Sequence, residues 1–446
     1  MSVLITFGKK SMKLFDLSLK LNQFPIGLAG KELESILHIS ESDFQEYNKT
    51  RRENIVNFHL KHNPLYKKLV PAEWNWEQLP VMKKSHLQQP LAERLSEGYS
   101  LKNVFVNKTS GSSGDPFVFA KDKFCHALIW ANIQRRWNWY GLDFNHSLQA
   151  RFYGMPLDYW SNTKLRLKDF LSNRYRFNIF DFSDKAMAEM VHIFTRKKFD
   201  YINGYANSII LFAKYLKRQH IVLKDICPTL KVCISTSEML FESDRNLLQA
   251  QFGVPVVNEY GAAELDVIAL ENPDGLWKIN AETIYVEILD RENRVLPYGE
   301  EGKIVVTSLY NHAHPMIRYE VGDLGVLDPS STEKNPILKQ LLGRQNDTVY
   351  LPSGKTAPGM AFYTITKQLF NDEGNVNEFI VIQVKTDTFE IHYTAKETLS
   401  VSEMARIEAV FFQYLESGLT LIFVRKETIE REPSGKLKQF ISKIGL

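Results

Sequence analysis

Thr-Ser-Gly-Ser-Ser-Gly-Asp-Pro-Phe, residues 109–117, lies between two short apolar runs at 104–106 and 117–119. This pattern predicts a tight loop between two strands. Its glycines permit backbone conformations that a Cβ disfavours, and its hydroxyls and successive N–H groups can surround a phosphate. No lysine follows the second glycine, so the loop is not that of P-loop NTPases. A Ser/Gly turn without a ligand explains the loop equally well.

Composition favours a globular protein of at least two domains. The chain has 446 residues, 44% of them apolar, and a net charge of +3 from 55 basic and 52 acidic side chains. This balance gives no indication of a nucleic-acid partner. The three cysteines lack CxxC spacing, which favours a reducing compartment, and we expect a cytoplasmic protein. No apolar run reaches about 18 residues, so we expect no membrane span.

Beyond the first hundred residues, which are rich in helical patterns, strands and helices alternate. Strands are predicted at 177–182, 199–202, 230–234 and 255–258, and helices after Ser183 and at 207–218 and 242–252. Such alternation requires crossover connections, which predicts a mainly parallel sheet flanked by helices. Ligands bind beyond the carboxyl ends of such strands, where residues 235–238 and 259–264 fall.

The remainder of the chain predicts two further units. Residues 277–326 are strand-rich, and the last hundred residues form a small α+β pattern with strands at 379–384, 389–393 and 419–424 and a helix at 402–415. We find no low-complexity linker and place a short hinge near Asn346. The predicted fold class is therefore α/β, with a large N-terminal domain (1–345) and a small, mobile C-terminal α+β domain (346–446).

Several short motifs follow one another in a defined order. They are Asn63–Lys68, Leu79–Lys84, Thr109–Pro116, Tyr201–Ser208, Ser235–Glu238, Glu259–Glu264, Arg318–Asp323, Gly343–Asp347 and Pro433–Lys436. In this order they resemble the adenylate-forming (acyl/aryl-CoA synthetase) superfamily, specifically the phenylacetate–CoA ligase branch, which includes relatives found with capsular-polysaccharide genes. The resemblance covers most of the chain. It implies ATP-dependent activation of a small carboxylic acid as an acyl-adenylate, with pyrophosphate release, and then acyl transfer to a thiol.

The resemblance also assigns roles to residues. The catalytic set is Lys436, Glu264 and Arg344, with Glu264 also holding Mg²⁺ and Asn346 acting as the hinge. The nucleotide-binding set is Thr109, Ser110, Gly111, Ser112, Ser113, Gly114, Ser237, Glu238, Glu259, Tyr260, Gly261, Ala262, Asp323 and Arg344. The acyl pocket is assigned to Gly204, Tyr205, Ala206 and Ser235.

These residue types suit the chemistry that the resemblance implies. A carboxylate such as Glu264 is a ligand that Mg²⁺ prefers, and an ionised Asp323 can accept hydrogen bonds from both ribose hydroxyls. Lys436 is a compact cation able to bridge the substrate carboxylate and the α-phosphate. Two positions depart from the family pattern. Ala263 stands where a Thr or Ser is usual, and Asn346 where an Asp or Lys is usual, which puts the rate in doubt.

Three functions remain open at this level. The first is an ATP-dependent ligase that uses coenzyme A as co-substrate. The second passes the acyl group to a carrier protein or to a sugar amine in polysaccharide biosynthesis, and the third is a catalytically silent nucleotide-binding relative. The expected partners are the acid and ATP, with a carrier protein and a homodimer as further possibilities from the family. The identity of the acid is not encoded in any motif.

Overall fold

The computed structural model describes residues 14–109, 117–155, 159–344, 348–358, 376–431, 437–438 and 440–444. Its helices include α1 (Leu14–Leu21), α2 (Ile26–His38), α3 (Glu41–His62), α4 (Pro64–Leu69), α5 (Leu91–Arg94), α6 (Lys123–Trp137), α7 (Tyr159–Leu171), α8 (Asp184–Arg196), α9 (Ala206–Arg218), α10 (Leu223–Ile226), α11 (Glu242–Phe252) and α13 (Val401–Tyr414). Among the described residues, no helix is both long and apolar enough to cross a bilayer.

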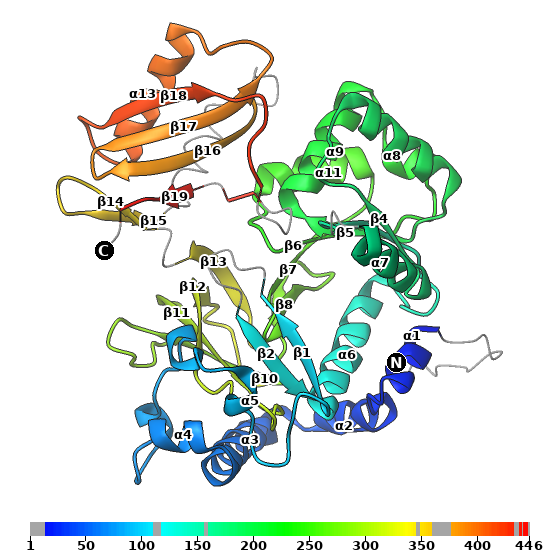
Figure 1. The fold of residues 1–446 in the computed structure, drawn as a ribbon, viewed down its shortest axis with the longest axis vertical. Helices are drawn as coiled ribbons and strands as arrows, with labels where there is room; N and C mark the ends of the chain where they lie inside the picture. The colour runs from blue at the N-terminus through cyan, green and yellow to red at the C-terminus, as the bar shows by residue number, and fades with distance from the viewer. Residues whose placement is uncertain are drawn as a thin grey trace.

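A seven-stranded sheet forms the centre of the large unit (Figure 1). Its strands are β3 (Gln149–Phe152), β4 (Arg174–Phe177), β5 (Tyr201–Tyr205), β6 (Val232–Thr236), β7 (Val256–Ala262), β8 (Asp266–Glu271) and β9 (Trp277–Ile279), in the order β4-β3-β5-β6-β7-β8-β9. The strands from β4 to β7 are parallel, and β8 and β9 join antiparallel. The carboxyl ends of β5, β6 and β7 therefore meet at one edge, where the predicted motifs begin.

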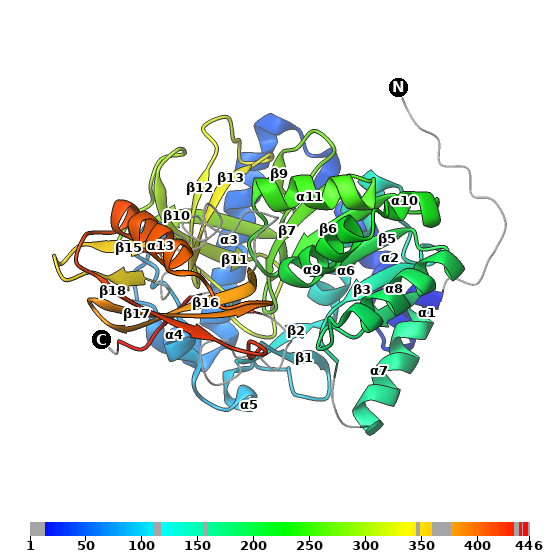
Figure 2. The same cartoon turned by 90° about the horizontal axis from the view of Figure 1, so that it is seen from above.

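Each face of this sheet is covered by helices, because its parallel strands are apolar on both sides. One face packs Ala150, Ile202 and Cys233 against α8, α9 and α11. The opposite face packs Val232, Ile234 and Val257 against α6, with α1 and α2 outside it. Figure 2 shows the sheet between these layers. The helix α6 begins at the N-cap Asp122 and gives way to a 3₁₀ turn that stops at Gly141, which has a positive φ of 66°.

The strand-rich region is a second, antiparallel sheet. It contains β10 (Ile284–Leu289), β11 (Glu301–Ser308), β12 (Tyr319–Leu327) and β13 (Leu338–Arg344), in that order. The hairpin β1 (Val104–Lys108) and β2 (Val118–Asp122) carries the glycine loop at its tip. Side chains of β2, β7 and β12 share one core that includes Phe119, Tyr260 and Tyr319. This shared core brings three of the predicted motifs together.

The C-terminal residues form a unit with its own core. The strands β16 (Val376–Lys385), β17 (Thr388–Ala395), β18 (Thr420–Arg425) and β19 (Phe440–Ser442) make a sheet in the order β18-β17-β16-β19, covered by α13. The short hairpin β14 (Thr348–Tyr350) and β15 (Thr356–Pro358) joins this unit, because Val349 and Leu351 lie in its core. The membership of the core therefore changes between Arg344 and Val349. The predicted hinge Asn346 lies outside the described residues.

The predicted fold class is confirmed, and most predicted elements are present. The strand predicted at 177–182 is wrong, because β4 ends at Phe177. β4 is an edge strand that carries two arginines, Arg174 and Arg176, and Arg176 pairs with the buried Asp169. Because of these two charges, the sequence of β4 lacks the apolar pattern that indicates a strand. The apolar residues that follow β4 lie in a loop before Ser183, the N-cap of α8.

Candidate active site

Thr109 closes the base of the glycine loop. Its N–H donates to the carbonyl of Phe117 at 2.9 Å, and the N–H of Phe117 donates to the Thr109 hydroxyl at 3.0 Å. The two strands predicted on either side of residues 110–116 are therefore confirmed. The assignment of the loop to phosphate stays a prediction, because the described residues exclude Ser110, Gly111, Ser112, Ser113 and Gly114.

A buried lysine joins this hairpin to the turn between β7 and β8. Lys121, on β2, is 1% exposed, and its Nζ donates to the carbonyl of Ala263 at 3.3 Å and to the carboxylate of Asp266. Asp266 has a positive φ of 60°. A Cβ at Gly261 would lie 2.4 Å from the Asp266 carbonyl oxygen, so the tight turn requires glycine there. Sequence reasoning missed Lys121, although a lone lysine in an apolar strand is a usable signal.

Asp323 sits where the two sheets meet and is held from both sides. The Tyr260 hydroxyl donates to Asp323 Oδ2 at 2.7 Å, and Arg344 Nε lies 3.5 Å from Oδ1. Asp323 is only 7% exposed, whereas the Arg344 side chain is 46% exposed. Burial, and then the Asp323 charge, raise the pKa of Tyr260 well above its usual value, so Tyr260 is a firm donor. The structure thus brings together three residues that the sequence assigned to the nucleotide.

Glu264 lies beside this cluster of Tyr260, Asp323 and Arg344. It is 5% exposed, and the Tyr319 hydroxyl donates to its Oε1 at 2.8 Å. No group of three or more His, Cys, Asp or Glu side chains suited to a metal occurs among the described residues. A single carboxylate still fits Mg²⁺, which commonly takes one or two protein carboxylates and fills its shell with waters and substrate phosphates.

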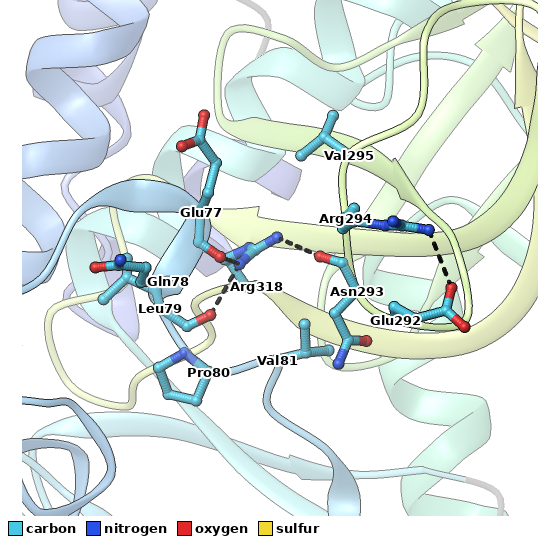
Figure 3. Close-up of a pocket in the computed structure, with 10 residues that line it drawn as sticks. All are labelled: Glu77, Gln78, Leu79, Pro80, Val81, Glu292, Asn293, Arg294, Val295 and Arg318. Carbon is cyan, nitrogen blue, oxygen red and sulfur yellow. Dashed lines mark hydrogen bonds and ion pairs between the residues drawn. The ribbon is translucent and has the colours of Figure 1, made fainter.

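Arg318, which begins the motif ending at Asp323, has a structural role. It is fully buried, and its guanidinium donates to Glu287 at 3.3 Å and to the carbonyls of Glu77 and Leu79 at 2.9 and 2.8 Å. Figure 3 shows the contacts of Arg318 with Glu77 and Leu79, at a cavity of about 510 Å³ between residues 77–81 and the turn 292–295. None of the residues that line this cavity belongs to the predicted active site. The hydrogen bonds of Arg318 instead stabilise the wall of the cavity.

Glu238 connects the large unit to the C-terminal one. Its Oε2 accepts the N–H of Asn207 at the start of α9 at 2.8 Å, and its Oε1 accepts the N–H of Leu437 at 2.9 Å. Ser237 beside it has a positive φ of 69°, which is uncommon for a residue with a Cβ. Leu437 directly follows Lys436, which lies outside the described residues. The backbone next to the predicted catalytic lysine is therefore docked at the carboxyl end of β6.

The predicted acyl-pocket residues lie at the ends of β5 and β6. Ala206 and Ser235 are fully buried, and Tyr205 is 8% exposed. A Cβ at Gly204 would lie 2.4 Å from the Cβ of Phe152, so glycine is required there by the close approach of β3 and β5. Neither Ser237 nor Ala262 shows a polar contact that tests its assigned role. The pocket assignment remains a prediction.

No family model matches the chain, but curated relatives do. It is 30% identical over 131 residues to the phenylacetate-coenzyme A ligase of Aromatoleum evansii, which covers 28% of this chain and 29% of that protein. It is 27% identical over 263 residues to the Pseudomonas putida phenylacetate-coenzyme A ligase, covering 55% and 54%. The protein CapK of Staphylococcus aureus is 24% identical over 335 residues, covering 71% and 70%. These similarities confirm the resemblance, predicted from the motifs, to the phenylacetate–CoA ligase branch of the adenylate-forming superfamily. The chain thus matches less than a third of the first ligase and about half of the second.

Solved structures share the fold of this chain. 2-Hydroxyisobutyryl-CoA ligase in the postadenylation state, in complex with 2-HIB-AMP, superposes with a TM-score of 0.67 at 17% identity, covering 89% of each chain. The same ligase in the thioesterification state, with 2-HIB-AMP and CoA, gives 0.55 at 16% identity, covering 91% of this chain and 90% of that one. ATP-bound MatB from Rhodopseudomonas palustris gives 0.51 at 15% identity over 75% of this chain and 66% of that one.

Proposed function

We propose that this protein is an adenylate-forming enzyme, an AMP-forming acid–thiol ligase. It activates a small carboxylic acid with ATP, releases pyrophosphate, and passes the acyl group of the adenylate to a thiol, for which coenzyme A is the first candidate. The observation that carries the proposal is the Tyr260–Asp323–Arg344 cluster beside the buried Glu264. Supporting it, relatives over parts of the chain are phenylacetate-coenzyme A ligases.

The protein's task is to bring two anions together and stabilise the charge that builds on the α-phosphate. A carboxylate oxygen has two lone pairs, so Asp323 can keep Tyr260 and Arg344 and still accept both ribose hydroxyls. Arg344, partly exposed, adds a positive charge on the solvent side of the same carboxylate. Glu264 would hold Mg²⁺, which would screen the phosphate charges.

The second half of the reaction requires a different arrangement. In the proposal, Lys436 bridges the substrate carboxylate and the α-phosphate, and it must leave before a thiol can reach the adenylate. The Glu238–Leu437 contact would hold the terminal loop in place for the first half. A rotation of the C-terminal unit about Asn346 would break this contact for the second half.

Pyrophosphate exchange tests the proposal directly. The protein is incubated with ATP, Mg²⁺ and labelled pyrophosphate across a panel of carboxylic acids, and acid-dependent label in ATP is the expected result. Lys436→Ala should lower this exchange by several orders of magnitude but should still convert pre-made acyl-adenylate to product. Absence of acid-dependent exchange with every acid would leave the silent nucleotide-binding alternative.

The acceptor requires a separate measurement. Coenzyme A, a carrier-protein phosphopantetheine thiol and an amino sugar are offered in turn to the adenylate-loaded protein, and AMP release is followed. AMP release with coenzyme A alone supports the proposal. Release only with the carrier protein would keep the thiol assignment but replace coenzyme A with that protein. Release only with the amine would replace the thiol assignment, and either result would leave adenylation intact.

A further inference from the structure

The helix α7 exposes large apolar side chains to solvent. Trp160 near its start is 75% exposed, and Leu167, Phe170 and Leu171 are 60%, 75% and 45% exposed. At about 100° per residue, these four positions fall within one stripe about 100° wide along the helix. Figure 2 shows α7 projecting from the large unit. Single exposed apolar residues are normal on a protein surface, but a contiguous stripe of large ones indicates an interaction site.

Basic residues border this apolar stripe on both sides. By the same helical rotation, Lys164 and Lys168 lie along one edge of the stripe and Arg166 along the other, and all three are exposed. The only acidic residue in the sequence of α7 is Asp169, which is buried and pairs with Arg176 of β4 at 2.7 Å. The exposed side of α7 is therefore apolar along its centre and positively charged along its edges.

Further positive charge lies near the C-terminal end of α7. Burial, and then the charges of Arg174 and Arg151, lower the pKa of Lys168, and the opposing charge of Asp169 offsets this effect only in part. Arg174 begins β4, and Arg151 lies on the neighbouring strand β3. Because these basic groups gather on one side of the molecule, that side should attract an anionic surface.

The helix α1 lies next to the C-terminal end of α7. Asn145 joins the two, because its Oδ1 accepts the N–H of Asp16 in α1 at 3.2 Å and its carbonyl accepts the side chain of Asn173, just after α7, at 2.8 Å. Both figures place the two helices beside each other (Figures 1 and 2). On α1, Leu21 is 75% exposed and follows the exposed Lys20. The combination of exposed apolar and basic side chains therefore recurs on α1.

We propose that α7, with α1 beside it, docks this protein on the surface of an anionic phospholipid bilayer. Helices with this composition lie in the plane of the interface, with Phe and Leu side chains among the acyl chains and the long basic side chains reaching the phosphates. Trp160 suits such a position, because indole rings favour the boundary between acyl chains and headgroups. A bilayer also accepts a projecting helix, whereas a protein partner would need a groove of matching shape. A second copy of this chain fits less well, since two α7 helices face to face would bring their basic side chains together.

Vesicle sedimentation tests the proposal with the full chain and without any substrate, so its outcome does not depend on the proposed ligase activity. The protein is mixed with vesicles of phosphatidylcholine alone or of phosphatidylcholine with phosphatidylglycerol, and the bound fraction is measured against lipid concentration. We expect binding to the phosphatidylglycerol vesicles that weakens as the salt concentration rises, and much weaker binding to phosphatidylcholine alone. Brominated phospholipid should quench part of the tryptophan emission, and Trp160→Phe should remove that part.

Two pairs of substitutions separate the charged and apolar contributions. Lys164→Gln with Arg166→Gln should weaken binding to the anionic vesicles about 30-fold, at about fivefold for each basic side chain removed. Leu167→Ser with Phe170→Ser should weaken binding at least about tenfold, because two side chains no longer leave water for the acyl region. All four side chains are exposed, so thermal melting should stay close to that of wild type.

Lys185→Gln on α8 and Val401→Ser on α13 are the matched controls, because each removes an exposed side chain of the same kind elsewhere, and both should bind as wild type does. Failure of the wild-type protein to bind the anionic vesicles would overturn the proposal, as would equal binding by the α7 variants and the controls. Self-association in sedimentation velocity that disappears in the Leu167→Ser, Phe170→Ser protein would assign the stripe to a second copy instead. Binding of the carrier protein, without binding to vesicles, would assign it to that partner.

Discussion

The Lys121–Asp266 pair gives the sharpest test of how the site is assembled. Lys121→Met keeps the length of the side chain and removes its charge. Because Lys121 is almost fully buried, the change leaves the Ala263 carbonyl and the Asp266 carboxylate without their donor. Breaking a buried ion pair costs about 3–5 kcal/mol, and the Asp266 side chain is 27% exposed, so water recovers part of this. We therefore expect a loss near the lower value, about 3 kcal/mol.

Urea unfolding measures this loss, and a double-mutant cycle assigns it. Asp266→Asn is the matched partner, because Asn tolerates the positive φ at this position. If the pair interacts as the structure indicates, the double variant should be more stable than the sum of the single losses predicts. Lys185→Met, on the exposed side of α8, is the control and should stay within about 0.5 kcal/mol of wild type.

Activity should fall with the same substitution, since the turn carries Glu264. Pyrophosphate exchange in Lys121→Met is expected to drop more than ATP binding does, because Asp323 is held by other residues. A Lys121→Met protein that loses less than about 1 kcal/mol, or that shows no coupling to Asp266→Asn, would refute the reasoning.

Three further predictions follow from the same geometry. Asp323→Ala should leave a folded protein but weaken ATP binding roughly ten- to ten-thousand-fold, through two lost charge-assisted hydrogen bonds of about 1.5–3 kcal/mol each; unchanged affinity by calorimetry would refute the ribose assignment. The Glu259 carboxyl, with a pKa raised by burial from 4.5 to about 7, supports folding fully below its unfolded pKa and loses this support as the pH rises toward 7. Glu259→Gln should therefore match wild-type stability at about pH 4 and exceed it at about pH 8, by up to about 3 kcal/mol in urea unfolding; equal stability at both pH values would contradict the burial argument. Ala263 is exposed, so Ala263→Thr has room to add a hydroxyl and should raise the adenylation rate by no more than about tenfold, as stopped-flow pyrophosphate release would show; a slower variant would mean that the Lys121 contact has already fixed the turn for alanine.

Local patterns predicted much of the fold. The alternation of apolar strands and capped helices between residues 199 and 258 required crossovers, and hence the parallel sheet that the structure shows. The apolar flanks of the glycine loop predict the two strands β1 and β2, and Thr109 and Phe117 are joined by two hydrogen bonds beside the loop. The motifs assign Tyr260 and Asp323 to one ligand, and the structure joins the two side chains by a hydrogen bond.

Contacts between distant residues were not predictable in this way. Lys121 and Asp266 are 145 positions apart, and no periodicity links a lysine in one strand to an aspartate at the start of another. The sequence places Arg318 in the predicted ribose motif. In the structure, its guanidinium instead donates to Glu287 and to backbone carbonyls of residues 76–79. The role of such a side chain depends on which chain segments surround it, and that information arises only when the segments have packed.

The proposed rotation of the C-terminal unit requires contacts with the large unit that are weaker than the contacts within the C-terminal unit itself. Its own core is extensive. Its ties to the large unit include the Leu437 N–H on Glu238 and the guanidinium of Arg431 over Phe182, 5.5 Å from the ring centroid. A backbone N–H on a carboxylate is worth about 1.5–3 kcal/mol, far less than the core that holds the unit together. Glu238 also accepts a second bond from Asn207, so its charge would stay compensated if the proposed rotation removed Leu437. A contact of this size can order the loop for one half-reaction and be given up for the next, which is the property that two-step acyl transfer requires.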